Sequence, residues 1–78
     1  MPATSAVRSA KPVQITLNGE PYELDQPLSV DDLLARLDLD PRRVAIEYNL
    51  SIIRRPVWPQ TIVQEGDRLE IVNFVGGG

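Results

Sequence analysis

A two-residue alternation of hydrophobic and polar positions begins at Val13. Val13, Ile15 and Leu17 are apolar, whereas the residues between them are polar. A strand with one buried face has this period, because successive side chains point to opposite faces of a sheet. The Asn18-Gly19 pair that follows is typical of a two-residue hairpin turn, since it tolerates positive φ angles. Residues 20–24 are therefore predicted to return as an antiparallel strand.

The period then changes from that of a strand to that of a helix. Four apolar residues recur at the spacing of one helix face: Val30, Leu33, Leu34 and Leu37. This stripe predicts a helix that lies across the sheet and buries these side chains in the core. Ser29 precedes the stripe, and its hydroxyl can accept a backbone N–H as an N-cap. The Asp40-Pro41 pair is expected to end the helix.

Three further segments with apolar residues complete the predicted sheet. Residues 44–48 form a short apolar run and are expected to be a central strand. Residues 52–53 predict a brief edge strand, and residues 54–59 predict a proline-constrained loop that packs Trp58 against the fold. After a glycine-containing turn, residues 68–75 are predicted to form the last strand.

The last strand is predicted to expose an apolar patch. Leu69 and Ile71 are expected to face the helix, and the pleat then turns Val72 and Phe74 away from the core. An exposed apolar patch of this kind is typical of a surface that binds a partner. In the alternative interpretation, the strand ends near Asn73 and Phe74 folds back into the core.

The sequence ends in Val75 followed by three glycines, residues 76–78. Glycine has no Cβ, so such a tail can thread a slot too narrow for side chains and present its carboxylate to another enzyme. The alternative is an ordinary glycine-rich chain end. Residues 1–12 lack an apolar period and are expected to be a disordered leader. This division leaves residues 13–75 as the folded domain.

The length and composition of the chain exclude several classes of catalytic and metal site. A chain of 78 residues is near the lower limit for independent folding and offers no room for a large catalytic cleft. It contains neither cysteine nor histidine, which removes thiol nucleophiles, imidazole bases and the usual zinc ligands. Four carboxylates in helix and turn positions are expected to be structural: Asp31, Asp32, Glu65 and Asp67. The composition therefore leaves no self-contained catalytic constellation, and we expect the protein to bind no metal.

The net charge of −3 argues against nucleic acid as a partner and favours partners with basic or apolar docking surfaces. The one dense basic spot, Arg54-Arg55, is small. No apolar run is long enough to span a bilayer. We expect a soluble, cytoplasmic protein without a membrane partner.

The predicted elements follow the order of two strands, a helix and then three strands. A helical crossover between the first hairpin and a later strand allows a parallel pair at the centre of the sheet. The order predicts an α+β protein of the ubiquitin-like β-grasp fold. In this fold, a mixed sheet of four to five strands carries one main helix across one face.

Four segments form a recognisable series along the chain: Ile15-Thr16-Leu17-Asn18-Gly19-Glu20, Asp32-Leu33-Leu34, Glu65-Gly66-Asp67-Arg68-Leu69-Glu70-Ile71-Val72 and Phe74-Val75-Gly76-Gly77-Gly78. Together they resemble the ThiS family, the sulfur carriers of thiamine (thiazole) biosynthesis. The resemblance covers nearly everything from Val13 onward. It departs from the family at the turn formed by residues 49–51 and at the proline-rich residues 56–59.

The resemblance implies a protein cosubstrate rather than an enzyme, with no bound cofactor of its own. A ThiF-like adenylating enzyme would use ATP and Mg²⁺ to convert the Gly78 carboxylate into an acyl-adenylate. A persulfide from a cysteine desulfurase or another donor would then leave a thiocarboxylate, which would give its sulfur to a ThiG-like thiazole synthase. The residues before Gly78 are the predicted partner contacts: Val72, Phe74, Val75, Gly76 and Gly77.

Three other functions are compatible with the same fold. The first is a sulfur carrier like the small subunit of molybdopterin synthase, which usually has a different apolar segment before its glycines. The second is a ubiquitin-like modifier that is ligated through Gly78 to target lysines. The third is a plain interaction domain, for which deletion of the glycines would change nothing.

Overall fold

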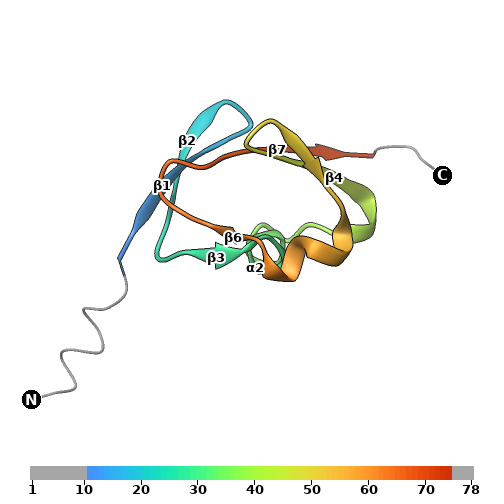
Figure 1. Ribbon diagram of the computed structural model, residues 1–78, viewed down its shortest axis with the longest axis horizontal. Helices are drawn as coiled ribbons and strands as arrows, with labels where there is room; N and C mark the ends of the chain where they lie inside the picture. The colour runs from blue at the N-terminus through green and yellow to red at the C-terminus, as the bar shows by residue number, and fades with distance from the viewer. Residues whose placement is uncertain (1–10, 75–78) are drawn as a thin grey trace, which may run out of the picture.

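A computed structural model describes residues 11–74 of the chain (Figure 1). Within these residues it contains a mixed five-stranded sheet, a separate two-stranded ladder, one α-helix and two 3₁₀ helices. The five sheet strands, in spatial order, are β2 (Glu20–Leu24), β1 (Val13–Leu17), β7 (Arg68–Asn73), β4 (Val44–Tyr48) and β5 (Ser51–Ile53). The other elements are β3 (Leu28–Ser29), α2 (Val30–Arg36), η1 (Pro41–Arg43), η2 (Arg55–Gln60) and β6 (Ile62–Val63).

The first hairpin has the predicted geometry. Strands β1 and β2 are antiparallel, with Val13 opposite Leu24 and Leu17 opposite Glu20. Asn18 and Gly19 form the turn with φ angles of 52° and 83°. Both angles lie in the left-handed region that this dipeptide tolerates, so the local sequence fixes the register of the hairpin.

Helix α2 begins where the sequence predicts and ends earlier. The Ser29 side-chain oxygen accepts a hydrogen bond from the Asp32 backbone N–H at 3.1 Å, which confirms the N-cap. The helix was expected to continue to Asp40-Pro41, but its last residue is Arg36. Asp38 adopts a left-handed φ of 61°, which turns the chain out of the helix two residues before Asp40 caps η1.

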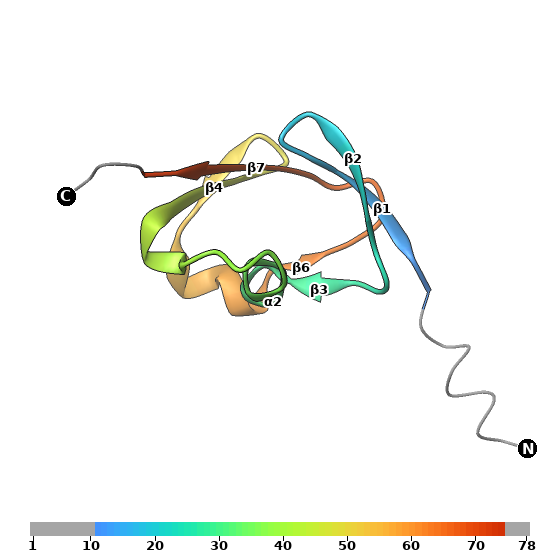
Figure 2. The ribbon, with the colours of Figure 1, turned by 180° about the vertical axis from the view of Figure 1, so that it is seen from behind.

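The core lies between the sheet and the layer formed by α2, η2 and the β3–β6 ladder (Figure 2). The helix stripe is buried as predicted, apart from Leu37, which is half-buried. Eleven hydrophobic side chains make up the buried cluster of the described residues: Val13, Ile15, Leu24, Val30, Leu33, Leu34, Val44, Ile46, Trp58, Val63 and Leu69. The fold is therefore the predicted α+β arrangement, in which one main helix crosses one face of a mixed sheet.

Two features of the helix-side layer differ from the sequence interpretation. The segment predicted as a loop around Trp58 is the 3₁₀ helix η2, and Trp58 is buried as expected, with its indole N–H donating to the Ile53 carbonyl at 3.1 Å. The β3–β6 ladder, with Leu28 opposite Val63, was not predicted. Strands of two residues carry no measurable period, so the sequence offers no signal for them.

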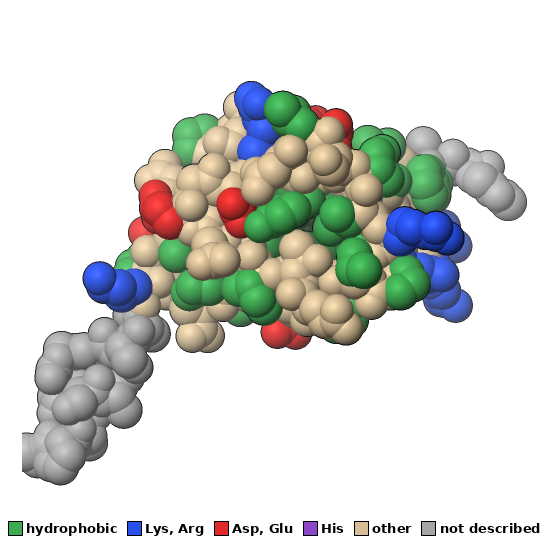
Figure 3. Space-filling view, in the orientation of Figure 1, with side chains coloured by type: hydrophobic (Ala, Val, Ile, Leu, Met, Phe, Trp, Pro, Cys, Tyr) green, Lys and Arg blue, Asp and Glu red, His purple; other side chains and the backbone are tan. Residues whose placement is uncertain are grey.

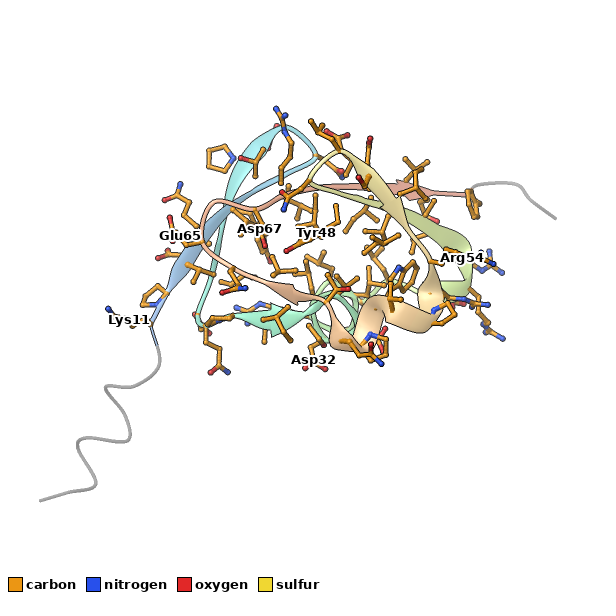
Figure 4. All side chains as sticks on the ribbon, in the orientation of Figure 1. Lys11, Asp32, Tyr48, Arg54, Glu65 and Asp67 are labelled. Carbon is orange, nitrogen blue, oxygen red and sulfur yellow. The ribbon has the colours of Figure 1, made fainter. Side chains whose placement is uncertain are left out.

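The Asp67 carboxylate joins the turn before β7 to the end of β4 (Figure 4). It accepts hydrogen bonds from the Tyr48 hydroxyl at 2.7 Å, from the Gln64 backbone N–H at 2.8 Å and from the Asn49 side-chain amide at 3.2 Å. Burial raises the pKa of Tyr48 to about 12, and the hydrogen bond and charge of Asp67 add to this rise. Asp67 thus has the structural role that the sequence predicts for it.

Replacing Leu34 with alanine is expected to lower the free energy of unfolding by about 2–5 kcal/mol, because the side chain is almost fully buried and its removal leaves a cavity. Urea unfolding followed by Trp58 fluorescence measures the change. Ile52→Ala is the matched control, since Ile52 is exposed and its truncation should cost less than about 0.5 kcal/mol. Equal losses in the two variants would contradict the assignment of the core.

Replacing Tyr48 with phenylalanine tests the Asp67 network through its pH dependence. The folded-state pKa of Tyr48 is about 12 against an ordinary value of 10.0. Folded protein therefore keeps a proton that the unfolded chain loses between pH 10 and pH 12, so the free energy of unfolding falls as the pH rises.

We expect Tyr48→Phe to be less stable than the parent by about 1 kcal/mol at neutral pH, because a hydrogen bond is lost. The parent should then lose roughly 1–3 kcal/mol more than Tyr48→Phe between pH 10 and pH 12. Denaturant unfolding of both proteins at several pH values gives this difference. Parallel stability curves for the two proteins would show that Tyr48 is not the group responsible.

Candidate functional site

Strand β7 is the element that carries the chain to its glycine tail. It lies inside the sheet, parallel to β1 on one side and antiparallel to β4 on the other. In Figure 1 it runs along the sheet and ends at the right-hand side of the molecule, opposite the end at which β1 begins. The position of Phe74, the last described residue before the tail, therefore depends on how β7 is held.

Asn18 extends the short ladder between β1 and β7. The paired residues of this ladder are only Thr16 with Arg68 and Leu17 with Leu69. Beyond them, the Asn18 backbone N–H donates to the Leu69 carbonyl at 2.8 Å, and the Asn18 side-chain oxygen accepts from the Ile71 backbone N–H at 2.7 Å. Sequence reasoning identified Asn18 only as a turn residue. Its second role depends on a strand more than fifty positions away and leaves no local signal.

Strand β4 holds the other edge of β7 to its end. The antiparallel register runs from Tyr48 opposite Leu69 to Val44 opposite Asn73. The strand was predicted to reach Val75 but ends at Asn73 among the described residues. One more hydrogen bond follows, from the Phe74 backbone N–H to the Arg43 carbonyl at 2.7 Å. The main chain is thus fixed as far as Phe74.

The side chains at the end of β7 form the predicted exposed patch. Leu69 is buried and Ile71 is half-buried against the core, whereas 58% of Val72 and 52% of Phe74 are exposed. The alternative in which Phe74 folds into the core is wrong. Ala45 pairs with Val72 across the sheet and shares its face. We name Ala45, Val72 and Phe74 the outer apolar patch; its contact with a partner stays a prediction.

Several predicted residues fall outside the part of the chain that the structure describes. They are Val75, Gly76, Gly77 and Gly78 of the tail and residues 1–10 of the predicted leader. The outer apolar patch ends at Phe74, directly before these tail residues in the sequence.

Charged residues border the outer apolar patch at the start of β4. The Asp40 carboxylate accepts hydrogen bonds from the backbone N–H and guanidinium of Arg42, and it lies 3.7 Å from the Arg43 guanidinium. The backbone hydrogen bond from Arg42, followed by its side-chain hydrogen bond, holds the pKa of Asp40 below its ordinary value. Asp40 therefore stays ionised and anchors η1 beside the end of β7.

Within residues 11–74, neither a metal-ligand group nor an acid-base group lines the hollow beside β7. No group of three or more histidine, cysteine, aspartate or glutamate residues in this range could bind a metal ion. A hollow of about 380 Å³ beside β7 has four apolar and two amide side chains in its lining: Leu17, Leu37, Leu39, Ile71, Asn18 and Asn73. It therefore lacks a titratable group for acid or base chemistry. Among the same residues, no helix is long and apolar enough to cross a membrane.

Comparisons with known proteins agree on one family. The sequence profile of the ThiS family matches residues 15–78. The sulfur carrier protein ThiS of Escherichia coli K12 is 32% identical over 66 residues, which are 85% of this chain and 100% of that protein. The thiazole synthase of Paramagnetospirillum magneticum is 41% identical over 66 residues, but this chain spans only 20% of its length.

The fold comparison gives the same result. The crystal structure of the thiamine biosynthesis protein ThiS from Geobacter metallireducens superimposes with a TM-score of 0.74 at 33% sequence identity. The match covers 85% of this chain and 100% of that one. These matches confirm the ubiquitin-like β-grasp fold and the resemblance seen in the sequence. The chain belongs to the ThiS family of sulfur carrier proteins of thiamine biosynthesis.

Proposed function

We propose that the α-carboxylate of Gly78 is the sulfur attachment site of this carrier and that the protein acts as a cosubstrate of separate enzymes. The observation that carries the proposal is the end of β7, which is held to Ile71 on one edge and to Phe74 on the other. It exposes Val72 and Phe74 four to six residues before Gly78. A strand that is fixed in the sheet, carries an exposed apolar patch and is followed by glycines suits insertion of the C-terminus into an enzyme.

The chemistry requires activation of the carboxylate. A carboxylate is resonance-stabilised and has a poor leaving group, so it does not exchange oxygen for sulfur unaided. In the proposed cycle, a Gly78 carboxylate oxygen attacks the α-phosphorus of Mg²⁺-ATP on a ThiF-like adenylating enzyme, and pyrophosphate leaves. The terminal sulfur of a persulfide then attacks the acyl-adenylate carbon and displaces AMP. A thiol cleaves the S–S bond and leaves the thiocarboxylate.

The proposed acceptor of the sulfur is a ThiG-like thiazole synthase. Two thiazole synthases, from Paramagnetospirillum magneticum and Magnetococcus marinus, contain a segment that is 41% and 36% identical to this chain. A carrier-like segment within the chain of its consumer favours direct contact between the two. The persulfide donor is proposed to be a cysteine desulfurase or a related enzyme. The cycle needs ATP, which favours a cytoplasmic location.

Intact mass spectrometry tests the sulfur attachment site directly. The protein is incubated with ATP, Mg²⁺, the adenylating enzyme and a sulfur donor, and then treated with a mild thiol. We expect a mass gain equal to the replacement of one oxygen by sulfur. A variant lacking Gly78 should show no gain, because it presents a shortened tail to the active site.

Two other outcomes of this experiment would argue against the proposal. No gain in the parent, with an adenylating enzyme shown to be active on another carrier, would exclude the proposal. Covalent adducts on lysine side chains of other proteins would favour the ubiquitin-like modifier instead.

Replacing Phe74 with alanine is expected to separate binding from stability. Because the ring is about half exposed, the free energy of unfolding should fall by no more than about 1 kcal/mol. The dissociation constant for the adenylating enzyme should rise roughly tenfold if the ring inserts into a pocket of the partner. Urea unfolding and calorimetric titration measure the two quantities.

Leu50→Ala is the matched control for Phe74→Ala. Leu50 is 69% exposed and lies in the turn between β4 and β5, at the other end of β4 from the outer apolar patch. Its truncation should leave the dissociation constant unchanged. Unchanged binding in Phe74→Ala would remove the ring from the partner contact.

A further inference from the structure

Four arginines gather around the end of β7. Arg42 and Arg43 lie in η1 directly before β4, and the Arg43 carbonyl accepts the Phe74 backbone N–H. Arg54 and Arg55 directly follow β5. Because β4 and β5 are antiparallel, with Ile46 opposite Ile53, the beginning of β4 and the end of β5 lie at the same end of the sheet. We name these four residues the arginine cluster.

The figures show the same arrangement. In Figure 3, Lys and Arg side chains gather at the right-hand end of the visible face, beside the end of β7. Figure 4 labels Arg54 at this end and Lys11 at the opposite end of the molecule. Arg54 has extended backbone angles, and its neighbour Ile53 faces the core side. The alternation of a strand therefore directs Arg54 to the outer face, beside Ala45 of the outer apolar patch.

The arginine cluster is a local excess of positive charge on an acidic protein. The chain has a net charge of −3. Among the described residues, the only carboxylate paired with the cluster is Asp40, which lies within 4 Å of both Arg42 and Arg43. Arg54 and Arg55 form no ion pair within residues 11–74, and Arg54 makes no side-chain cap for η2.

Within the described residues, only Arg42 and Arg43 of the cluster form an ion pair that could stabilise the fold. All four side chains are exposed. Like charges that lie close together repel one another and lower the stability of the folded state. Asp40 offsets part of this repulsion in η1, but no ion pair within the described residues offsets it at Arg54 and Arg55. A partner that supplies negative charge would account for their position.

We propose that the arginine cluster is a docking surface for the adenylating enzyme and that it meets carboxylates around the opening that receives the tail. The proposal rests on the proposed function. Insertion of Gly78 into an active site brings the end of β7 against the enzyme, and the arginine cluster comes with it. Covering guanidinium groups without partners is costly, so the enzyme surface must present carboxylates opposite them.

This surface differs from the one that net charge favours. The net charge of −3 favours a basic partner. However, charges act only over short distances, because the Debye screening length at physiological salt is about 8 Å. The cluster therefore dominates the field close to Phe74, while the distant carboxylates are screened. The acidic body and basic end should orient the carrier with its tail toward an acidic opening, which raises the association rate more than it slows dissociation.

Two double variants with the same net charge test the proposal. Arg54→Gln/Arg55→Gln removes two charges from the cluster, whereas Lys11→Gln/Arg68→Gln removes two charges elsewhere. Lys11 lies at the opposite end of the molecule and Arg68 at the opposite end of β7 from Phe74. All four side chains are exposed, so both variants should unfold at the same urea concentration as the parent.

We expect Arg54→Gln/Arg55→Gln to lower the association rate with the adenylating enzyme about five- to tenfold and to flatten its dependence on salt. The KM for the carrier should rise by a similar factor with kcat unchanged at saturation. Lys11→Gln/Arg68→Gln should behave as the parent in all three measurements. Surface plasmon resonance at about 50 to 300 mM NaCl, a range over which the Debye length falls roughly twofold, gives the rates without turnover.

Three outcomes overturn the proposal or separate it from the proposed function. Equal association rates for the two double variants would exclude a docking role for the cluster, as would a parent that does not bind the enzyme. Binding of the parent that depends on Arg54 and Arg55 but yields no thiocarboxylate would uphold the docking surface and exclude the proposed chemistry.

Discussion

The placement of β7 between β1 and β4 is the constraint on which the rest of the structure depends. Its parallel ladder with β1 has only two paired positions, and Asn18 lengthens the contact by binding the backbone of both Leu69 and Ile71. On the other edge, the ladder with β4 continues to Asn73 and then to the hydrogen bond between Phe74 and Arg43. A strand held on both edges gives the tail a fixed point of departure.

The pleat of β7 divides the protein into a face that stabilises the fold and a face available for recognition. Leu69 is buried with the helix-side layer, while Val72 and Phe74 remain exposed on the other side. A substitution on one face should therefore change stability, and a substitution on the other should change binding. This separation suits the proposed carrier function, because the surface proposed to bind enzymes is not part of the core.

Much of the fold could be predicted because its signals are local. The Asn18-Gly19 turn, the Ser29 cap and the stripe from Val30 to Leu34 each depend on residues within a few positions of one another. The errors arose where the chain turned earlier, or paired at longer range, than the local pattern indicated. The helix was expected to reach Asp40-Pro41, but Asp38 turns left-handed after Arg36 and brings Leu39 against the core cluster. The β3–β6 ladder exists only because two short segments meet in space.

The sequence by itself determined the family, the order of the main elements and the glycine tail as the proposed site of chemistry. Each of these depends on residues that are contiguous in the chain. Tertiary structure alone decided what surrounds the point where the tail departs. Arg54-Arg55 is a small basic spot in the sequence, but antiparallel pairing of β4 with β5 brings it to the same end of the sheet as Arg42 and Arg43. Charge acts through distance in space, so a cluster assembled from two segments cannot be counted from either one.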